Sequence, residues 1–168
     1  MSQKEENKIH QTYKVGIRRN TRQVNVGGVL IGGGAPISVQ TMTKTKTGDV
    51  KATVNQIIEA AEAGCDLVRV TVNDKEAAEA MPKIVMKSPI PVVADIHFNH
   101  MFALKAIEAG VAKVRINPGN IGSKDRIKQV LDAAKEKNIP IRIGVNSGSL
   151  EEDILEKHGY PTPEALYQ

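Results

Sequence analysis

Three arginines of this sequence lie in the middle of short apolar segments, where an arginine is uncommon. Arg69 lies in DLVRVTV, Arg115 in KVRINPGN and Arg142 in PIRIGVN, and each has valine or isoleucine on both sides. A guanidinium group carries a permanent charge and a planar fork of donors that matches the oxygens of a carboxylate or a phosphate. Their recurrence in successive segments predicts one site for a molecule with several anionic oxygens.

Other polar side chains accompany the arginines. Asp95 and His97 stand two residues apart in VADIHF, and Asn117 and Asn146 each follow an arginine segment. An Asp/His pair suits acid–base work or the positioning of a substrate hydroxyl. Asp-x-His could also supply half of a metal site, but no further His or Cys lies at a matching spacing, so we expect no metal ligands in this chain.

A regular alternation of strands and helices is predicted to position these side chains. A hairpin is expected around Gly27-Gly28, because paired glycines allow the positive φ angles of a two-residue turn. Strands are then expected in SVQTMT, DLVRVTV, PVVADIHF, KVRINP and PIRIGVN. The helices are expected to begin at capping residues, namely Asp49, Asp74, Asn99, Ser123, Ser149 (in a capping box with Glu152) and Thr162. The helix after Asp74 is expected to break or kink near Pro82.

The two-residue period of a strand sorts the side chains into two faces. One face is apolar, as with Val68, Val70 and Val72, whereas the other collects the three arginines, Asp95, His97, Asn117 and Asn146. An open, doubly wound sheet is the competing architecture, but it is covered on both faces and its strands are apolar throughout. We therefore expect a TIM (β/α)8-type barrel, with the polar face in the lumen and the site at the carboxyl ends of the strands.

The sequence is expected to supply only part of such a barrel. A complete one has eight strands and about 250 residues, whereas this chain has 168 residues and five expected barrel strands. Residues 1–18 are expected to form a mobile tail, and residues 19–168 the N-terminal part of the barrel. The alternative is a complete, smaller α/β domain.

The arginines are expected to require a counter-charge. Burying unpaired charge costs several kcal/mol for each group, and Asp95 is expected to offset one of the three. A ligand with two phosphoryl groups would balance the rest. The alternative is that the arginines pair with carboxylates from further strands.

Composition excludes several classes of partner. The net charge is +4, but aromatic residues make up only 3% of the chain, and single-stranded nucleic acid is bound on aromatic platforms, so we expect no nucleic-acid partner. No apolar run is long enough for a membrane span, and the first residues do not resemble a secretory signal. The single cysteine, Cys65, excludes an internal disulfide and fits a cytoplasmic location.

The strings VQTMT, VRVTV, VADIHF, VRINPGNIG and IPIRIGVNSGSLEEDIL occur in this order and spacing. Together they resemble the N-terminal barrel of the 4-hydroxy-3-methylbut-2-enyl diphosphate synthases, enzymes of the non-mevalonate (MEP) isoprenoid pathway. The resemblance runs from about Arg19 to the last residue.

The resemblance implies an oxidoreductase that converts 2-C-methyl-D-erythritol 2,4-cyclodiphosphate to 4-hydroxy-3-methylbut-2-enyl diphosphate by two-electron reductive ring opening and dehydroxylation. It implies that Arg69, Arg115 and Arg142 hold the diphosphate beside Asn117 and Asn146. Asp95 and His97 would then lie near the carbon skeleton.

The resemblance also implies a homodimer, ferredoxin or flavodoxin as the electron donor, and a [4Fe–4S] cluster on a separate domain. Cys65 does not match a cluster ligand, so we expect this chain to bind no cluster and to be inactive alone. Two other readings stay open: a barrel like dihydropteroate synthase, which binds a pterin diphosphate, and an anion-binding module without chemistry of its own.

Overall fold

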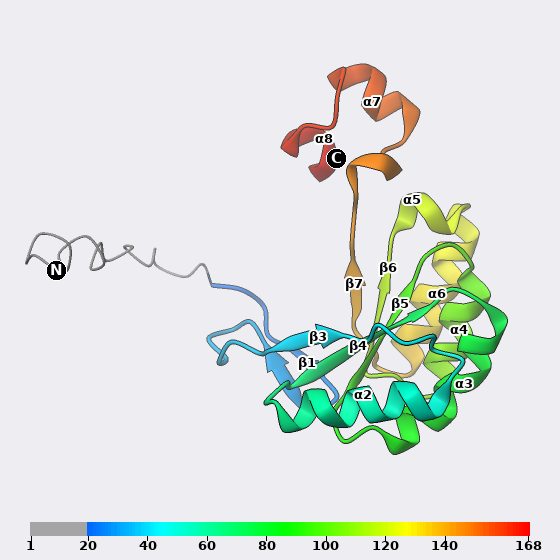
Figure 1. Cartoon of the computed structure of the whole chain (residues 1–168). Coiled ribbons are helices and arrows are strands. Elements are labelled where there is room, and N and C mark those ends of the chain that lie inside the picture. The colour runs from blue at the N-terminus through cyan, green and yellow to red at the C-terminus, as the bar shows by residue number, and fades with distance from the viewer. Residues whose placement is uncertain (1–19) are drawn as a thin grey trace, which may run out of the picture.

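The protein is described by a computed structural model that covers residues 20–168, and the tail predicted for residues 1–18 lies outside the described residues. A five-stranded parallel sheet forms its centre (Figure 1). Its strands follow one another in chain order: β3 (Gln40–Met42), β4 (Leu67–Val72), β5 (Val92–Ile96), β6 (Lys113–Ile116) and β7 (Ile141–Ile143). The five strands are those expected from the sequence.

Helices connect consecutive strands and cover one face of the sheet (Figure 1). They are α2 (Val50–Glu62), α3 (Lys75–Lys87), α4 (His100–Glu108), the short α5 (Pro118–Ile121) and α6 (Lys124–Glu136). Asp49, Asp74 and Asn99 cap α2, α3 and α4, as predicted, because each side chain accepts a backbone N–H of the first helical turn. The long helices pack side by side in chain order, α2 on α3, α3 on α4 and α4 on α6.

The apolar face of the strands packs under these helices. Val68, Val70 and Val72 of β4 are completely buried in the core, together with Ile57 of α2 and Ile84 of α3. The strand order never reverses, and all the connecting helices lie on one side. A doubly wound sheet reverses its order and takes helices on both faces. The arrangement is therefore that of a partial TIM barrel, as the sequence predicts.

A hairpin closes the end of the sheet at which the strands begin. Strands β1 (Val24–Val26) and β2 (Val29–Ile31) pair antiparallel across Gly27 and Gly28, whose φ angles are +59° and +99°. A Cβ atom on Gly27 would lie 2.8 Å from Ala112 Cβ and 2.9 Å from Pro91 Cβ, so this turn rests on the loops before β5 and β6. We call this end of the barrel the floor and the carboxyl ends of the strands the mouth.

Two local predictions are wrong, and one short helix is unexpected. Helix α3 does not break at Pro82, because the apolar side chains Ala78, Met81 and Ile84 hold both halves of the helix against the sheet while Pro82 points outward. Pro118 and Gly119 form the first turn of α5, a short helix that is not expected from the sequence. Ser149 does not cap α7 (Glu152–His158), which begins after Glu151; it ends a 3₁₀ turn over Ser147–Ser149.

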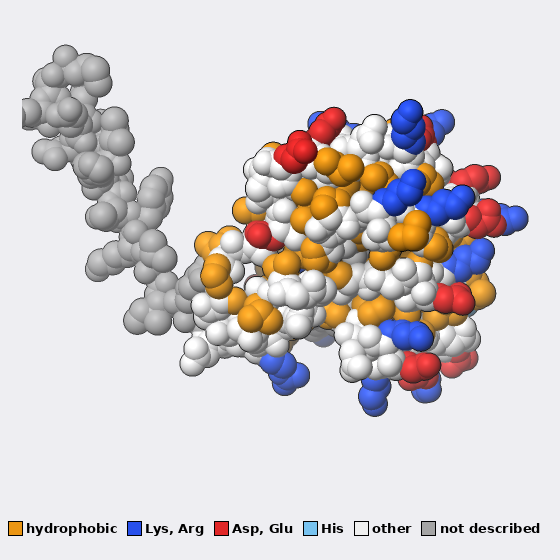
Figure 2. All heavy atoms as spheres, turned by 90° about the horizontal axis from the view of Figure 1, so that it is seen from below, with side chains coloured by type: hydrophobic (Ala, Val, Ile, Leu, Met, Phe, Trp, Pro, Cys, Tyr) orange, Lys and Arg blue, Asp and Glu red, His pale blue; other side chains and the backbone are white. Residues whose placement is uncertain are grey.

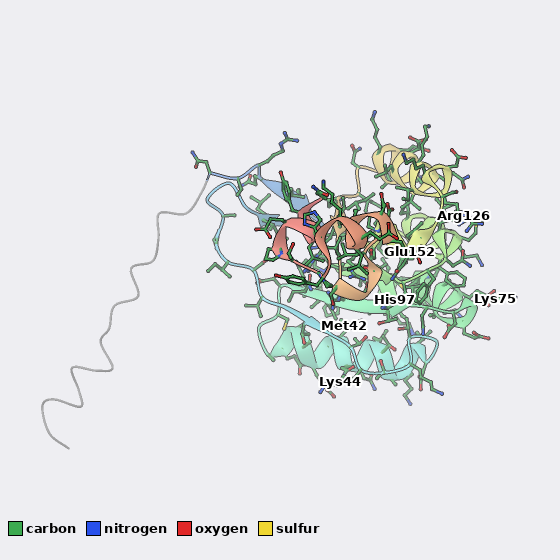
Figure 3. All side chains as sticks on the ribbon, turned by 90° about the horizontal axis from the view of Figure 1, so that it is seen from above. Met42, Lys44, Lys75, His97, Arg126 and Glu152 are labelled. Atoms are coloured by element: carbon green, nitrogen blue, oxygen red, sulfur yellow. The ribbon has the colours of Figure 1, made fainter. Side chains whose placement is uncertain are left out.

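The last two helices stand over the mouth of the barrel. Beyond β7 the chain rises to α7 and to α8 (Pro163–Tyr167), which begins at the predicted cap Thr162. Figure 1 shows both helices beyond the carboxyl ends of the strands, and the view from above in Figure 3 shows them projecting over the strands. Within residues 20–168, no helix has both the length and the apolar character that a membrane span requires.

Seen from below, the surface divides into two regions (Figure 2). Charged side chains of both signs gather on the right of the view, whereas the left part of the described surface is mainly apolar or uncharged. The outer charges therefore alternate in sign, which is typical of solvated helix faces.

We predict that Pro82→Ala stabilises the protein. The substitution restores one backbone N–H and with it one helical hydrogen bond, and it touches no buried contact because Pro82 is exposed. The free energy of unfolding, measured by urea denaturation, is expected to rise by about 1–3 kcal/mol. Lys83→Ala, at the next exposed position, is the control and is expected to change it by less than about 0.5 kcal/mol. An unchanged or lower stability of Pro82→Ala would contradict the interpretation.

Candidate functional site

One buried carboxylate joins two of the three arginines on the concave face of the sheet. Asp95 Oδ1 accepts a hydrogen bond from Arg115 Nη1 at 3.2 Å, and Asp95 Oδ2 lies 3.5 Å from Arg69 Nε. The Asp95 side chain is 5% exposed, and those of Arg115 and Arg69 are 12% and 26% exposed. Asp95 brings one negative charge, and its two oxygens divide that charge between arginines on both neighbouring strands.

The contacts of Arg69 extend to β3. Its Nε and Nη2 atoms lie 3.3 and 3.2 Å from the sulfur of Met42, which is the neighbouring residue in the parallel register. The thioether is a weak acceptor, so it orients the guanidinium without neutralising its charge. Arg69 is thereby held between Met42 on one side and Asp95 on the other.

Arg142 differs from the other two arginines. It pairs in register with Arg115 on the adjacent strand, but it is exposed, and no carboxylate within residues 20–168 lies within ion-pair distance of it. Its charge is thus available to a ligand. The three predicted arginines occupy one face, and the structure divides them into a compensated pair and a single uncompensated group.

Lys113 is a fourth cation of this face, and the sequence analysis missed it. It is the first residue of β6, two positions before Arg115, and only 8% of its surface is exposed. Burial lowers the pKa of its amine below the ordinary value of 10.5, and the nearby guanidinium groups of Arg142 and Arg69 lower it further. The two-residue period of Lys113, Arg115 and Asn117 would have found it.

The concave face therefore carries an excess of positive charge. Arg69, Lys113, Arg115 and Arg142 stand against the single carboxylate of Asp95, which leaves three positive charges when all five groups are ionised. Like charges within a low-dielectric lumen repel one another. A compact polyanion would relieve the repulsion among these cations, whereas a neutral ligand would not.

His97 presents an unused polar atom at the mouth. It directly follows β5, it is half-buried, and its Nδ1 atom is buried with no hydrogen-bond partner among the described residues. A buried polar atom without a partner is costly, and a ligand hydroxyl could satisfy it. Figure 3 labels His97 and Met42, which lie at the carboxyl ends of β5 and β3.

Asn117 and Asn146 are joined through Ser149. Asn117 is 1% exposed, and its Nδ2 donates to Ser149 Oγ at 2.7 Å. The same hydroxyl accepts from the Asn146 N–H at 3.2 Å and donates to the Asn146 carbonyl at 2.9 Å. The Asn117 amide nitrogen is thus engaged in holding the loop after β7 against the end of β6. The side chain of Asn146 stays exposed beside it.

Gly144 makes room for Arg115. A Cβ atom at Gly144 would lie 2.6 Å from Arg115 Nη2 and 2.9 Å from Arg115 Cζ, which is closer than Cβ contacts in proteins. The guanidinium therefore lies flat over the backbone of the neighbouring strand. Glycine at this position lets Arg115 reach Asp95.

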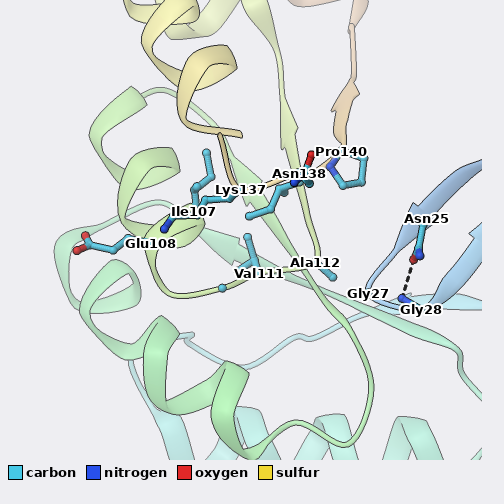
Figure 4. Close-up of a pocket in the computed structure, with 12 residues that line it drawn as sticks. Asn25, Gly27, Gly28, Ile107, Glu108, Val111, Ala112, Lys137, Asn138 and Pro140 are labelled. Carbon is cyan, nitrogen blue, oxygen red and sulfur yellow. Dashed lines mark hydrogen bonds between the residues drawn. The ribbon is translucent and has the colours of Figure 1, made fainter. Parts of the chain in front are cut away.

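A further hollow lies away from Asp95. It measures about 720 Å³ and is formed by the hairpin turn and the ends of α4 and α6 (Figure 4). A hydrogen bond of 2.7 Å from the Gly28 N–H to Asn25 Oδ1 shapes its rim. Its only ionisable residues are the exposed Glu108 and Lys137, so it is not part of the site at Asp95.

The residues present do not fit an iron–sulfur cluster. Such clusters are held by several cysteine thiolates, and this sequence has one cysteine. Cys65 is half-buried in the loop that leads into β4, at the floor end of the sheet. No group of three or more His, Cys, Asp or Glu within residues 20–168 lies together as metal ligands would.

The fold and the site define a class of protein: a TIM-type barrel whose concave face carries more cationic than anionic side chains. The chain matches the model of the family described as the GcpE TIM-barrel domain over residues 21–168. The protein belongs to this family.

Several curated relatives carry the name 4-hydroxy-3-methylbut-2-en-1-yl diphosphate synthase (flavodoxin). Identity is 60% over 151 residues with that of a Marinomonas species, covering 90% of this chain and 41% of the relative. It is 57% over 149 residues with that of Aquifex aeolicus, covering 89% of this chain and 42% of the relative. It is 59% over 160 residues with that of Pseudomonas aeruginosa, covering 95% and 43%. The chain thus spans about two fifths of the length of these relatives.

Among solved structures, dihydropteroate synthase from Xanthomonas albilineans in complex with 7,8-dihydropteroate superposes with a TM-score of 0.56. It is 18% identical and is matched over 82% of this chain and 54% of its own length. This likeness supports the barrel fold alone.

We predict that Gly144→Ala displaces Arg115 from Asp95. The added methyl group needs the space that the guanidinium occupies, and the flexible arginine side chain moves more easily than the backbone. Pyrophosphate binding, measured by titration calorimetry, is expected to weaken about tenfold, which corresponds to the loss of one charged hydrogen bond. Gly148→Ala is the matched control, because nothing lies within 4 Å of a Cβ atom there. Equal binding by the two variants would show that Arg115 does not depend on Gly144.

We predict that Lys113→Met stabilises the protein at pH 7 and that this advantage shrinks as the pH rises toward 10.5. The pKa of Lys113 is lower in the folded than in the unfolded chain, so the unfolded chain binds more protons and the parent gains stability with pH until 10.5. Urea denaturation of both proteins across this range measures the difference.

Lys128→Met is the control for this pH profile. The hydrogen bond that Lys128 Nζ donates to Asp132 Oδ2, together with the charge of that carboxylate, raises the pKa of Lys128, so this lysine stabilises the fold while it is charged. Its replacement is therefore not expected to increase stability at pH 7. Parallel pH profiles for the parent and Lys113→Met would show that Lys113 is not held in an environment that opposes its charge.

Proposed function

We propose that the concave face of this chain binds the diphosphate of 2-C-methyl-D-erythritol 2,4-cyclodiphosphate. It does so as part of an oxidoreductase of isoprenoid biosynthesis, which forms 4-hydroxy-3-methylbut-2-enyl diphosphate by two-electron reductive ring opening and loss of a hydroxyl. The observation that carries the proposal is the excess of positive charge on the concave face, where four cations stand with one carboxylate and two of them contact it.

Each side chain has a definite part in this proposal. Arg69 and Arg115, fixed in direction by Asp95, donate to the diphosphate oxygens, and Arg142 adds uncompensated charge. His97, through its free Nδ1, contacts an oxygen of the carbon skeleton near the mouth. Asn117 and Asn146 form the adjoining wall through Ser149. Asp95 acts as a positioning residue, because both of its oxygens are engaged by arginine.

The electrons come from outside these residues. Relatives with 57–60% identity are named as flavodoxin enzymes, which favours flavodoxin over ferredoxin as the donor. With one cysteine, these residues cannot hold a [4Fe–4S] cluster. A cluster held by other residues of the complete enzyme would supply the electron transfer. We propose that the complete enzyme is a cytoplasmic homodimer and that this chain by itself binds substrate without turning it over.

The proposal can be tested by titrating the chain with the cyclodiphosphate in a calorimeter. The cyclodiphosphate is expected to bind, and Arg115→Met is expected to weaken it about 10- to 100-fold by removing one charged hydrogen-bond donor. Arg126→Met on the outer surface of α6 is the control, because Arg126 is exposed and remote from Asp95. Full affinity in Arg115→Met, or no binding by the parent, would refute the proposal.

A second titration addresses the reading as a dihydropteroate-synthase-like protein. The chain is titrated with dihydropterin diphosphate under the same conditions. Preference for the cyclodiphosphate is expected, and stronger binding of the pterin compound would assign the site to that chemistry. Turnover of the cyclodiphosphate by the chain with reductant alone would contradict the proposed division between binding and electron supply.

A further inference from the structure

A second hollow with basic lining lies at the floor of the barrel, below the arginine pair. Its volume is about 450 Å³. Four of its lining residues are the first residues of their strands: Gln40 of β3, Leu67 of β4, Lys113 of β6 and Ile141 of β7. The hairpin closes it from below with Val24, Val26 and Ile31. It thus lies at the opposite end of the strands from His97 and Asn117.

The polar groups of this floor hollow all suit an anion. Lys113 and Arg142 are its two charged residues, and no carboxylate lines it. Ser38 and Gln40 add a hydroxyl and an amide, and neither side chain makes a hydrogen bond within residues 20–168. The remaining walls are apolar, which lowers the local dielectric and strengthens the attraction of a charged ligand.

Lys113 is the group that most needs a partner. The residue is more than nine-tenths buried, its amine nitrogen keeps a little contact with solvent, and no hydrogen bond or ion pair satisfies that amine among the described residues. Burial, and to a lesser degree the charges of Arg142 and Arg69, lower the pKa of this amine. Asp95 is already shared by Arg69 and Arg115, so the site at the mouth offers no relief. A buried charge of this kind is costly unless a counter-ion is supplied.

We propose that Lys113, Arg142, Ser38 and Gln40 form a second anion-binding subsite, which takes a phosphate group at the floor of the barrel. Lys113 supplies the buried charge, and Arg142 forms the boundary between this subsite and the arginine pair above. The phosphate is either free or the head group of a small ester whose carbon body packs against the hairpin valines. This inference shares Lys113 and Arg142 with the charge excess that supports the proposed function, but it can be tested separately because Arg69 and Arg115 do not line the floor hollow.

The location of binding is tested by titrating the ¹⁵N-labelled chain with inorganic phosphate and following its amide resonances. Shifts that saturate together at Leu67, Lys113 and Ile141 are expected for the floor subsite. Shifts confined to His97 and Asn117 would place phosphate at the mouth only and would overturn the proposal. The absence of any saturable shift at millimolar phosphate would also overturn it.

Variants of Lys113 test the proposed chemistry. Lys113→Met keeps the length of the side chain without its charge, and it is expected to weaken phosphate at the floor about 10- to 100-fold. Lys113→Arg keeps the charge and is expected to bind within a few-fold of the parent. Lys137→Met, in the separate hollow of Figure 4, is the control. Undiminished floor binding by Lys113→Met would overturn the assignment.

A thermal measurement and a second ligand complete the test. Phosphate is expected to raise the melting temperature of the parent by mass action and to leave that of Lys113→Met unchanged, and an equal rise in both would count against the subsite. In a parallel arm, 3-methylbutyl phosphate replaces inorganic phosphate. Tighter binding of the ester than of inorganic phosphate identifies a phosphate ester as the ligand class, whereas equal binding identifies free phosphate. Either result supports the subsite only if Lys113→Met weakens the binding.

Discussion

The bridge from Asp95 to Arg69 and Arg115 is the interaction on which the rest of the concave face depends. It joins β4, β5 and β6 through their side chains, and it fixes both guanidinium groups where a sheet would ordinarily present apolar packing. Removing one partner of such a buried pair leaves an uncompensated charge, at a cost of about 3–5 kcal/mol. The bridge thus couples the position of the ligand-binding arginines to the stability of three adjacent strands.

The architecture could be read from the sequence because its signals are local and mutually consistent. The paired glycines at Gly27 and Gly28, the caps Asp49 and Asp74 and the two-residue period of VRVTV each specify a conformation within a few residues. The break predicted at Pro82 does not occur, because the tendency of proline to interrupt a helix competes with tertiary packing. That packing is not visible in the sequence around Pro82. The short α5 and the 3₁₀ turn at Ser149 depend on contacts between segments far apart in the chain, such as Asn117 with Ser149.

The sequence predicted which side chains share the concave face, and it predicted less of the electrostatics of that face. The strand period placed Arg69, Asp95 and Arg115 on one face, but it could not show that one carboxylate reaches both arginines. That result depends on register, since Asp95 pairs directly with Arg115 on β6 and with Thr71 on β4, two residues from Arg69. Lys113 was overlooked because it begins its segment and therefore resembles a solvated strand end. The hairpin covers that end, which buries the lysine.

The cations of the concave face differ in whether a carboxylate contacts them, and this difference determines how the face can bind a phosphorylated ligand. The arginines with a carboxylate partner are directed by it and offer geometry, whereas Arg142 and Lys113 are uncompensated and offer charge. A polyanion bound here gains directed hydrogen bonds from the first pair and long-range attraction from the second. Were all four cations paired, the lumen would be nearly neutral and would hold a diphosphate weakly. Were none paired, the repulsion among them would oppose folding. A single aspartate among four cations therefore lets the chain fold while its concave face stays attractive to a phosphorylated ligand.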